Sequence, residues 1–131
     1  MQIFKSEYKT TDYDEHLSII TNRWTDAQMD DSIFQEEILI WVDFIEQFKP
    51  KGLIANTRNF NYLVSIEMQE WTNTVVFPRI IAAGVQKFAL VVNDDIITQL
   101  ALEQTMEEEK TGSFASKYFD NEHDAIKWLK K

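Results

Sequence analysis

Cysteine is absent from this sequence, and glycine and proline are scarce, with 3 and 2 residues in a chain of 131. Without cysteine the chain can form no disulfide, thiolate metal site or thiol nucleophile. So few glycines leave little room for a glycine-rich loop that cradles phosphate. The sequence also lacks an HExxH motif and a Gly-x-Ser-x-Gly turn, so the common zinc-protease and serine-hydrolase sites are not expected.

Basic residues are also few compared with acidic ones. The chain has 13 Lys and Arg against 22 Asp and Glu, which gives a formal net charge of −9. Nucleic acids and anionic lipid surfaces bind basic faces of proteins. This charge balance therefore predicts neither nucleic acid nor an anionic membrane as the main partner.

Long apolar runs are missing as well. No stretch approaches the roughly 20 apolar residues that a membrane-spanning helix needs, and the first residues lack the apolar segment of a signal peptide. We therefore expect a cytoplasmic protein with no integral membrane segment. The 44% of hydrophobic residues suffice for a buried core, and the length suits a single domain over residues 1–131.

The first part of the chain predicts a hairpin and a long helix. β-branched and aromatic residues on either side of a polar turn at residues 9–12 predict a β-hairpin over roughly residues 3–24. Apolar residues then recur at steps of four and three, as on one face of a helix: Phe34, Ile38, Trp41, Ile45 and Phe48. Asp30 or Asp31 can cap this helix, and Pro50 ends it.

The remaining chain alternates strands and helices. Short apolar runs at residues 52–55 and 87–92 predict buried strands, and residues 114–119 predict a last strand. Helices are expected over residues 65–83, over residues 95–110 and after Asp120 or Asn121, with Ser65 capping the first and Pro78 bending it near residues 75–77. The order β-β-α-β-α-β-α-β-α predicts an α/β fold, with a mostly parallel five-stranded sheet, an opening β-hairpin and four helices.

Several segments carry a resemblance to a known family. They are residues 49–54 (Lys-Pro-Lys-Gly-Leu-Ile), 56–60 (Asn-Thr-Arg-Asn-Phe), Glu70-Trp71, Phe77-Pro78, residues 103–109, and residues 118–129, which end in Ala125-x-x-Trp128-Leu129. With this spacing the chain resembles the STAS domain, and more closely its SpoIIAA-like, Sec14-related branch of mostly uncharacterised bacterial proteins. The resemblance covers nearly the whole chain and implies the STAS fold.

The same resemblance raises the question of a regulatory serine. Anti-sigma-factor antagonists of this family are phosphorylated in an Asp-Ser-Ser-Gly turn before the helix that follows the third strand. Here Val64-Ser65-Ile66-Glu67 occupies the corresponding stretch, and the phosphorylated position falls on Ile66. Ser65 remains as a candidate regulatory residue, at a helix N-terminus that favours phosphate but beside Glu67, which repels it.

Polar residues gather where the predicted strands end. Ligands of open α/β sheets bind at the carboxyl ends of the strands, near a topological switch point. The candidate ligand-binding residues at this edge are Arg58, Asn59, Asn61 and Asn93. A guanidinium can hold a carboxylate or phosphate in a fork. The alternative is that Arg58 pairs with a nearby aspartate (Asp26, Asp94 or Asp95) and that the asparagines satisfy turn backbone.

The predicted second helix offers a candidate apolar site. It carries a run of large apolar residues from Trp71 to Ile81, and together with the broad apolar face of the first helix this exceeds what a five-stranded sheet needs. The surplus would line a pocket for a hydrophobic ligand, with Trp71 in its wall, or form a seam between two copies of the chain. The alternative is ordinary core packing, because aromatic side chains dominate protein cores.

Three titratable residues complete the candidates. Glu37 falls within the apolar arc of the first helix, where burial would suit it to proton transfer; the alternative places it in a partly exposed first turn. His16 and His123 lie among acidic residues without the spacing of zinc ligands, so we expect both on the surface. We predict no metal site and no cofactor.

These observations favour a non-enzymatic STAS-like module that binds a small hydrophobic or anionic ligand, or a protein partner such as a second copy of itself. Two alternatives stay open. One is a degenerate regulator of the anti-sigma-antagonist type. The other is a hydrolase or lyase that uses the strand-end crevice around Arg58.

Overall fold

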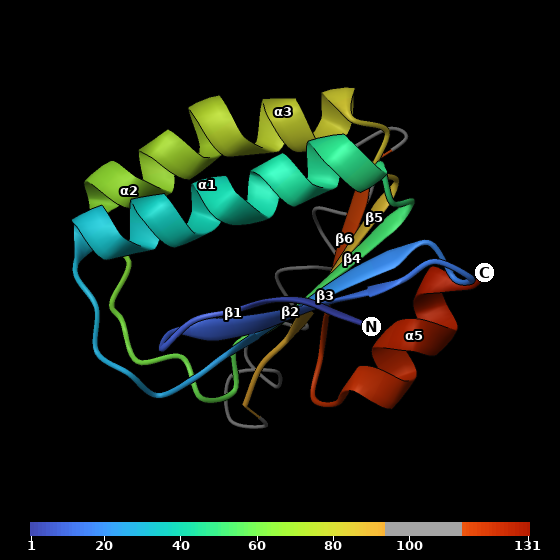
Figure 1. The fold of residues 1–131 in the computed structure, drawn as a ribbon, viewed down its shortest axis with the longest axis horizontal. Helices are drawn as coiled ribbons and strands as arrows, with labels where there is room; N and C mark the ends of the chain where they lie inside the picture. Colours follow the sequence, from blue (N-terminus) through green and yellow to red (C-terminus); the bar gives the residue numbers. More distant parts are fainter. Residues whose placement is uncertain (94–113) are drawn as a thin grey trace.

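The computed structural model describes residues 1–93 and 114–131, and within them six strands form one mixed sheet (Figure 1). The strands are β1 Gln2–Lys5, β2 Lys9–Asp14, β3 Ile19–Trp24, β4 Gly52–Asn56, β5 Lys87–Val91 and β6 Ala115–Phe119. They lie side by side in sequence order, with β1 to β3 antiparallel and β3 to β6 parallel. The α/β class is confirmed, whereas the prediction of five strands is wrong.

The additional strand is β2, at the residues where the sequence predicts a polar turn. Lys9 and Thr11 are fully buried, whereas Thr10, Asp12 and Tyr13 are half-buried and Asp14 is exposed. Alternation of apolar and polar residues is the usual signal of a half-buried strand. In β2 these buried positions are polar, so the signal is absent even though the strand pairs regularly with β3.

The helix α1 (Asp31–Phe48) confirms the first predicted helix. Asp30 is its N-cap, since the Asp30 side chain accepts a 2.9 Å hydrogen bond from the backbone N–H of Ile33 and so satisfies a free amide of the first turn. The helix ends at Lys49, which is left-handed with a φ of 50°. Pro50 follows and has no N–H with which to continue the helix.

The second predicted helix is confirmed in three consecutive parts: α2 (Ile66–Trp71), the π-helical turn η1 (Thr72–Val76) and α3 (Phe77–Ala82). Ser65 caps it, because the Ser65 hydroxyl accepts a 3.1 Å hydrogen bond from the N–H of Met68. Pro78 interrupts regular α-helical bonding, and the wider π turn lies directly before it. After the last turn Gly84 has a φ of 100°, a conformation that favours glycine.

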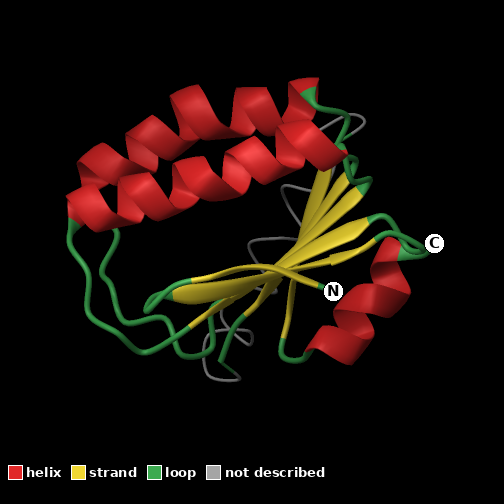
Figure 2. Cartoon of the chain, in the orientation of Figure 1, coloured by secondary structure: helices red, strands yellow, loops and turns green. Residues whose placement is uncertain are grey.

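Two layers of helices cover the sheet (Figure 2). The larger core lies between the sheet and the layer of α1, α2, η1 and α3, and it includes Ile20, Trp41, Ile45, Leu53 and Ile80. The smaller core joins the other face of the sheet to α5 (Glu122–Leu129) and contains Ile19, Ile54, Ala89, Val91 and Ala125. Asn121 caps α5 by accepting a 2.8 Å hydrogen bond from the N–H of Asp124. The fold therefore presents two different sheet–helix interfaces.

Three of the four predicted helices have counterparts in the structure: α1, the α2–η1–α3 unit and α5. The remaining one, over residues 95–110, lies outside the described residues. Within the described ranges, no helix combines the length and the apolar character that crossing a membrane requires.

Candidate ligand-binding cavity

A cavity of about 200 Å³ lies between the sheet and the layer of α1, η1 and α3. Its floor comes from three parallel strands and the residue beyond β4: Asn22, Trp24, Ala55, Thr57, Phe88 and Leu90. In the strand register Asn22 lies beside Ala55, and Ala55 lies beside Leu90. Ala55 has only a methyl side chain in the centre of this row, so the helices above it leave an unfilled space.

Helix and loop side chains form the rest of the wall. They are Phe34, Ile38 and Trp41 of α1, Thr72 and Val76 of η1, Phe77 of α3, and Phe60 and Val64 of the loop after β4. Phe60 packs edge-on against Trp24, with ring centroids 5.1 Å apart, and Phe34 stacks on Tyr62 at 4.9 Å. Aromatic side chains held against one another in this way suit a preformed, mostly apolar ligand site.

A buried chain of hydrogen bonds reaches the floor of the cavity. Lys9 Nζ lies 3.5 Å from Thr11 Oγ1, which lies 2.7 Å from Asn22 Oδ1. An ammonium group can only donate, so Thr11 accepts from Lys9 and gives its own hydrogen to Asn22 Oδ1. The oxygen of the Asn22 amide is thereby used, and the chain of hydrogen bonds ends at a residue of the cavity floor.

Lys9 and Glu37 are both buried beside this chain of hydrogen bonds. Burial lowers the pKa of the Lys9 ammonium group from 10.5 to about 8, while the charge of Glu37 acts in the opposite direction. The Phe4 ring centroid lies 4.3 Å from Lys9 Nζ, within cation–π range. Glu37 is 6% exposed and accepts a 2.6 Å hydrogen bond from the Ser6 hydroxyl. Glu37 is therefore buried, and the expected place in a partly exposed first turn is wrong.

Trp41 contributes to the cavity wall and carries a buried indole N–H group. Its side chain is buried, and its Nε1 atom has no hydrogen-bond partner within the described residues. Most buried polar groups in proteins are paired, and leaving one unpaired costs about 1–3 kcal/mol. The Trp41 indole N–H is therefore enclosed by the packing around it and does not face the accessible space of the cavity.

The residues predicted to form a strand-end site do not line the cavity above Ala55. Arg58 Nη1 donates to the backbone carbonyls of Asp120, at 2.6 Å, and Val92, at 3.3 Å. Arg58 thus joins the loop after β4 to the ends of β5 and β6. Asn59 and Asn93 are exposed.

The other two predicted ligand residues, Asn61 and Trp71, do not line the cavity either. Asn61 Nδ2 donates a 2.9 Å hydrogen bond to the backbone carbonyl of Asp26. Trp71 is half-buried, and its ring centroid lies 6.5 Å from that of Phe34 in the cavity wall. The described strands follow one another in sequence order, so they contain no reversal of order of the kind at which α/β proteins usually bind ligands.

The hydroxyl group of Ser65 both accepts and donates a hydrogen bond. Besides capping α2, it donates a 3.0 Å hydrogen bond to Asp31 Oδ2, and the hydroxyl of Tyr62 donates to the other oxygen of the same carboxylate. Burial, followed by the Asp31 carboxylate, raises the pKa of Tyr62 above its ordinary value. A phosphate on Ser65 would meet Asp31 as well as Glu67, and regulation at Ser65 stays a prediction.

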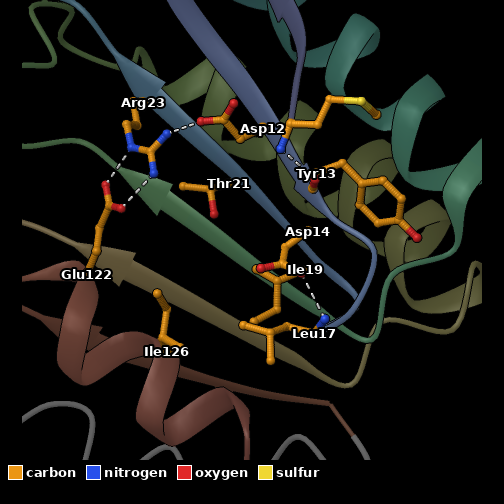
Figure 3. A pocket seen from close by; sticks show the side chains of 10 residues that line it. Asp12, Tyr13, Asp14, Leu17, Ile19, Thr21, Arg23, Glu122 and Ile126 are labelled. Carbon is orange, nitrogen blue, oxygen red and sulfur yellow. Dashed lines mark hydrogen bonds and ion pairs between the residues drawn. The ribbon is translucent and has the colours of Figure 1, made fainter.

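A second cavity, of about 290 Å³, lies on the opposite face of the sheet, beside α5 (Figure 3). Arg23 Nε and Nη2 each donate to Glu122 at 2.9 Å, and Arg23 Nη1 donates to Asp12. Asn56 Nδ2 also donates to Glu122, at 2.7 Å. The hydrogen bond to Glu122 is the main cause of a raised pKa of Arg23. These charges are paired with one another, so the arrangement fastens α5 to the sheet.

Both histidines lie on the surface. His16 and His123 are exposed, as predicted. Among residues 1–93 and 114–131, no group of three His, Cys, Asp or Glu side chains is placed to hold a metal ion.

Comparisons with models of protein families, with curated proteins and with solved structures found no match. The fold is therefore described as α/β with a mixed six-stranded sheet, and the resemblance to the STAS domain stays a prediction. A fold by itself does not determine a function, so the function has to be inferred from the cavity and the residues that line it.

The sequence does not predict Asn22, Ala55 or Lys9 as site residues. Alternation along residues 19–24 would have placed Asn22 on the same face as Ile20 and Trp24. No local signal marks Ala55, because the space above it depends on helix side chains that meet only in the folded chain. The sequence does not predict that Lys9 is buried beside the site, because lysine is rarely buried.

Proposed function

We propose that this protein is a non-enzymatic module that binds a small apolar molecule in the cavity above Ala55. The observation that carries the proposal is a space of about 200 Å³ walled mainly by aromatic and aliphatic side chains. An engineered apolar cavity of about 150 Å³ in another protein stays dry and binds benzene. A molecule with one aromatic ring and a short substituent fits a space of this size.

The competing interpretation is that the cavity is a packing defect. The space is partly open to the surface, so its volume is not that of a closed void in the core. Its apolar wall meets water when no ligand is bound, and a ligand that covers this wall would gain about 25 cal/mol per Å² of apolar surface buried.

Titration with toluene tests the proposal. Trp24 and Trp41 line the cavity, so toluene should change the intrinsic tryptophan fluorescence saturably and raise the thermal unfolding temperature. Ala55→Leu places three more carbon atoms in the cavity and should abolish both effects. Ala82→Leu, at an exposed position of α3, is the matched control and should retain them. Equal responses of the two variants, or no saturable response of the natural protein, would overturn the proposal.

A protein partner is the second candidate, in the form of a second copy of the chain. Leu63 is 92% exposed and Ile66 is 81% exposed, on either side of the cavity residue Val64. Two large exposed apolar side chains three positions apart in the chain favour an interaction surface. Sedimentation velocity should show a concentration-dependent dimer that the double variant Leu63→Ser/Ile66→Ser lacks and that Leu39→Ser, on α1, retains. A monomer at every concentration would rule this candidate out.

We also propose that the chain belongs with the STAS domains, in their SpoIIAA-like branch. The segments quoted from the sequence and the alternation of parallel strands with helices support this assignment. A degenerate regulator of the anti-sigma-antagonist type would then be the alternative function. This alternative predicts that the protein forms a complex with a bacterial anti-sigma kinase, or that such a kinase transfers phosphate to Ser65. If neither the complex nor the phosphate transfer is found, the alternative is excluded.

A further inference from the structure

We propose that the cavity of about 290 Å³ beside α5 (Figure 3) binds a small primary amine. The ammonium group of the ligand would contact the Thr21 hydroxyl group and the carboxylates of Asp12 and Asp14. This second site is independent of the cavity above Ala55, because the two cavities lie on opposite faces of the sheet and share no lining residue.

Thr21 provides the observation that points to a ligand. It is only 8% exposed, and its hydroxyl group has no hydrogen-bond partner within residues 1–93 and 114–131. The hydroxyl oxygen is not enclosed by packing, since the Thr21 side chain lines the cavity (Figure 3). Most buried polar groups in proteins are paired, so this hydroxyl group is a polar contact that a ligand in the cavity can use.

The strand register places two carboxylates around this hydroxyl group. Side chains two positions apart on a strand lie on the same face of a sheet, so Asp12 and Asp14 of β2 share a face. Across the antiparallel pair with β3, Asp12 lies beside Thr21 and Asp14 lies beside Ile19. Side chains directly opposite each other have Cβ atoms about 4.5–5.5 Å apart. One short row of the sheet thus carries two carboxylates, a hydroxyl group and an apolar side chain.

The charges that line the cavity favour a cation. The lining has three carboxylates, from Asp12, Asp14 and Glu122, against the guanidinium of Arg23 and the amino group of Met1. One negative charge is therefore in excess. Glu122 uses both of its oxygens on Arg23, so the excess lies with the two aspartates of β2.

The free atoms of the two aspartates are hydrogen-bond acceptors. Asp12 Oδ2 accepts from Arg23, and Asp14 Oδ1 accepts a 3.0 Å hydrogen bond from the N–H of Leu17. The second carboxylate oxygen of each aspartate has no partner in the part of the chain that the structure describes. An ammonium group has three hydrogens and no acceptor, so it matches these two oxygens together with the hydroxyl oxygen of Thr21.

Apolar side chains complete the wall and define the rest of the ligand. Leu17, Ile19 and Ile126 line the same cavity. Among the described residues no three His, Cys, Asp or Glu side chains are placed to hold a metal ion, so the arrangement suits an organic cation better than a metal. An ammonium group on a short aromatic or aliphatic stem fits both the polar and the apolar part of the wall.

Three probes of similar shape test the proposal. Phenethylamine, 2-phenylethanol and 3-phenylpropionate share a phenyl ring on a two-carbon chain and end in an ammonium, a hydroxyl and a carboxylate group. Their affinities at pH 7 are measured by NMR titration of the amide signals of β2 and β3. Phenethylamine should bind about fivefold more tightly than 2-phenylethanol, and 3-phenylpropionate should bind most weakly. The advantage of phenethylamine should shrink as salt is added.

Two variants assign the contacts. Thr21→Val removes the hydroxyl group at constant shape and should weaken phenethylamine by about fivefold without lowering the unfolding temperature, because no hydrogen bond within the protein is lost. Asp14→Asn keeps an oxygen for the N–H of Leu17 but removes the charge, and should weaken phenethylamine by about threefold. The matched controls are Thr10→Val on the same face of β2 and Glu67→Gln, which is exposed on α2; both should bind like the natural protein.

The outcomes separate this site from the cavity above Ala55. Equal affinities for the three probes, or no saturable shift with phenethylamine, would overturn the proposal. So would losses in the controls as large as those in Thr21→Val and Asp14→Asn, or no loss in these two variants. Ala55→Leu fills the other cavity and should leave phenethylamine binding unchanged; if it abolishes binding, the amine occupies the apolar cavity and the proposal is wrong.

Discussion

The hydroxyl group of Thr11 donates a 2.7 Å hydrogen bond to Oδ1 of Asn22 across the antiparallel pair of β2 and β3. Both side chains are buried, at 0% and 1% exposure. This bond links the Lys9 and Glu37 region to the floor of the apolar cavity and orients the amide that lines it. Four predictions test the chemistry around this bond, the ion pair of Arg23 with Glu122 on the other face of the sheet, and the loop after β4.

Replacing Thr11 with valine removes the hydroxyl group and keeps the shape of the side chain. Asn22 Oδ1 then loses its buried donor, and we expect the free energy of unfolding to fall by about 1–3 kcal/mol. Urea unfolding followed by circular dichroism measures the change. Thr11→Ser retains the hydroxyl group and should lose clearly less stability than Thr11→Val; the reverse order would contradict this account of β2.

Lys9 should make stability depend on alkaline pH. Its pKa in the folded state is about 8 instead of 10.5, so between these values the unfolded chain binds more protons than the folded one. Stability from this group is therefore lowest below pH 8 and rises towards pH 10.5. The full difference corresponds to about 3 kcal/mol.

The variant Lys9→Met isolates this effect. Subtracting its free energy of unfolding from that of the natural protein at each pH cancels the titration of other groups, including Tyr8, whose pKa is raised mainly by burial. We expect the natural protein to gain stability relative to Lys9→Met as the pH is raised from 8 to 10. A flat difference over this range would show that Lys9 titrates as an ordinary surface lysine.

Glu122 should contribute to stability in the opposite pH range. Burial is the largest single influence and favours its neutral form, but the hydrogen bonds from Arg23 and Asn56 and the Arg23 charge together lower its pKa below 4.5. Its contribution is therefore complete above about pH 4.5 and is lost as the pH falls through the lowered pKa. Because Arg23 and Glu122 are 43% and 24% exposed, we expect Glu122→Gln to cost only about 1 kcal/mol at pH 7.

The control for Glu122 is the pH profile itself. Glu122→Gln should lose less stability than the natural protein when the pH is lowered from 5 to 3, since the variant has no carboxylate to protonate at this position. Parallel profiles would mean that the contacts of Arg23 with Glu122 in Figure 3 contribute nothing measurable.

Arg58 should act on the loop after β4 and not on the cavity. Its side chain donates to the carbonyls of Val92 and Asp120 and does not line the cavity above Ala55. We expect Arg58→Ala to lower the unfolding temperature slightly, because these are exposed or partly buried hydrogen bonds, and to leave the toluene dissociation constant unchanged. A large loss of toluene affinity without loss of stability would move the site to the strand ends, as the sequence predicts.

The sequence predicts the architecture where local signals agree with burial. The α1 stripe, its Asp30 cap and the strand at residues 52–55 are recognisable because apolar residues recur at the spacing of the element and turn formers bound it. In β2 the inward residues Lys9 and Thr11 are polar, so the pattern resembles a turn. Their burial depends on partners far away in the sequence, such as Asn22 and Glu37.

The site is less predictable than the fold for the same reason. Arg58 and its neighbouring asparagines are conspicuous in the sequence, because polar residues after a buried strand stand out. Ala55 is inconspicuous, since an alanine in a strand has no distinctive chemistry of its own. A cavity is a property of several elements at once, and its volume is fixed only when β3, β4, β5 and the helices above them have packed.

Nuclear Overhauser effects from a bound probe test the central claim most directly. With toluene present in excess, the account predicts effects between toluene protons and the methyl groups of Ala55 and Val76, which line the cavity. It predicts none to Ala89 or Val91, which belong to the core on the α5 side of the sheet. Contacts to Ala89 and Val91 instead, or none to Ala55 and Val76 at saturating toluene, would contradict it.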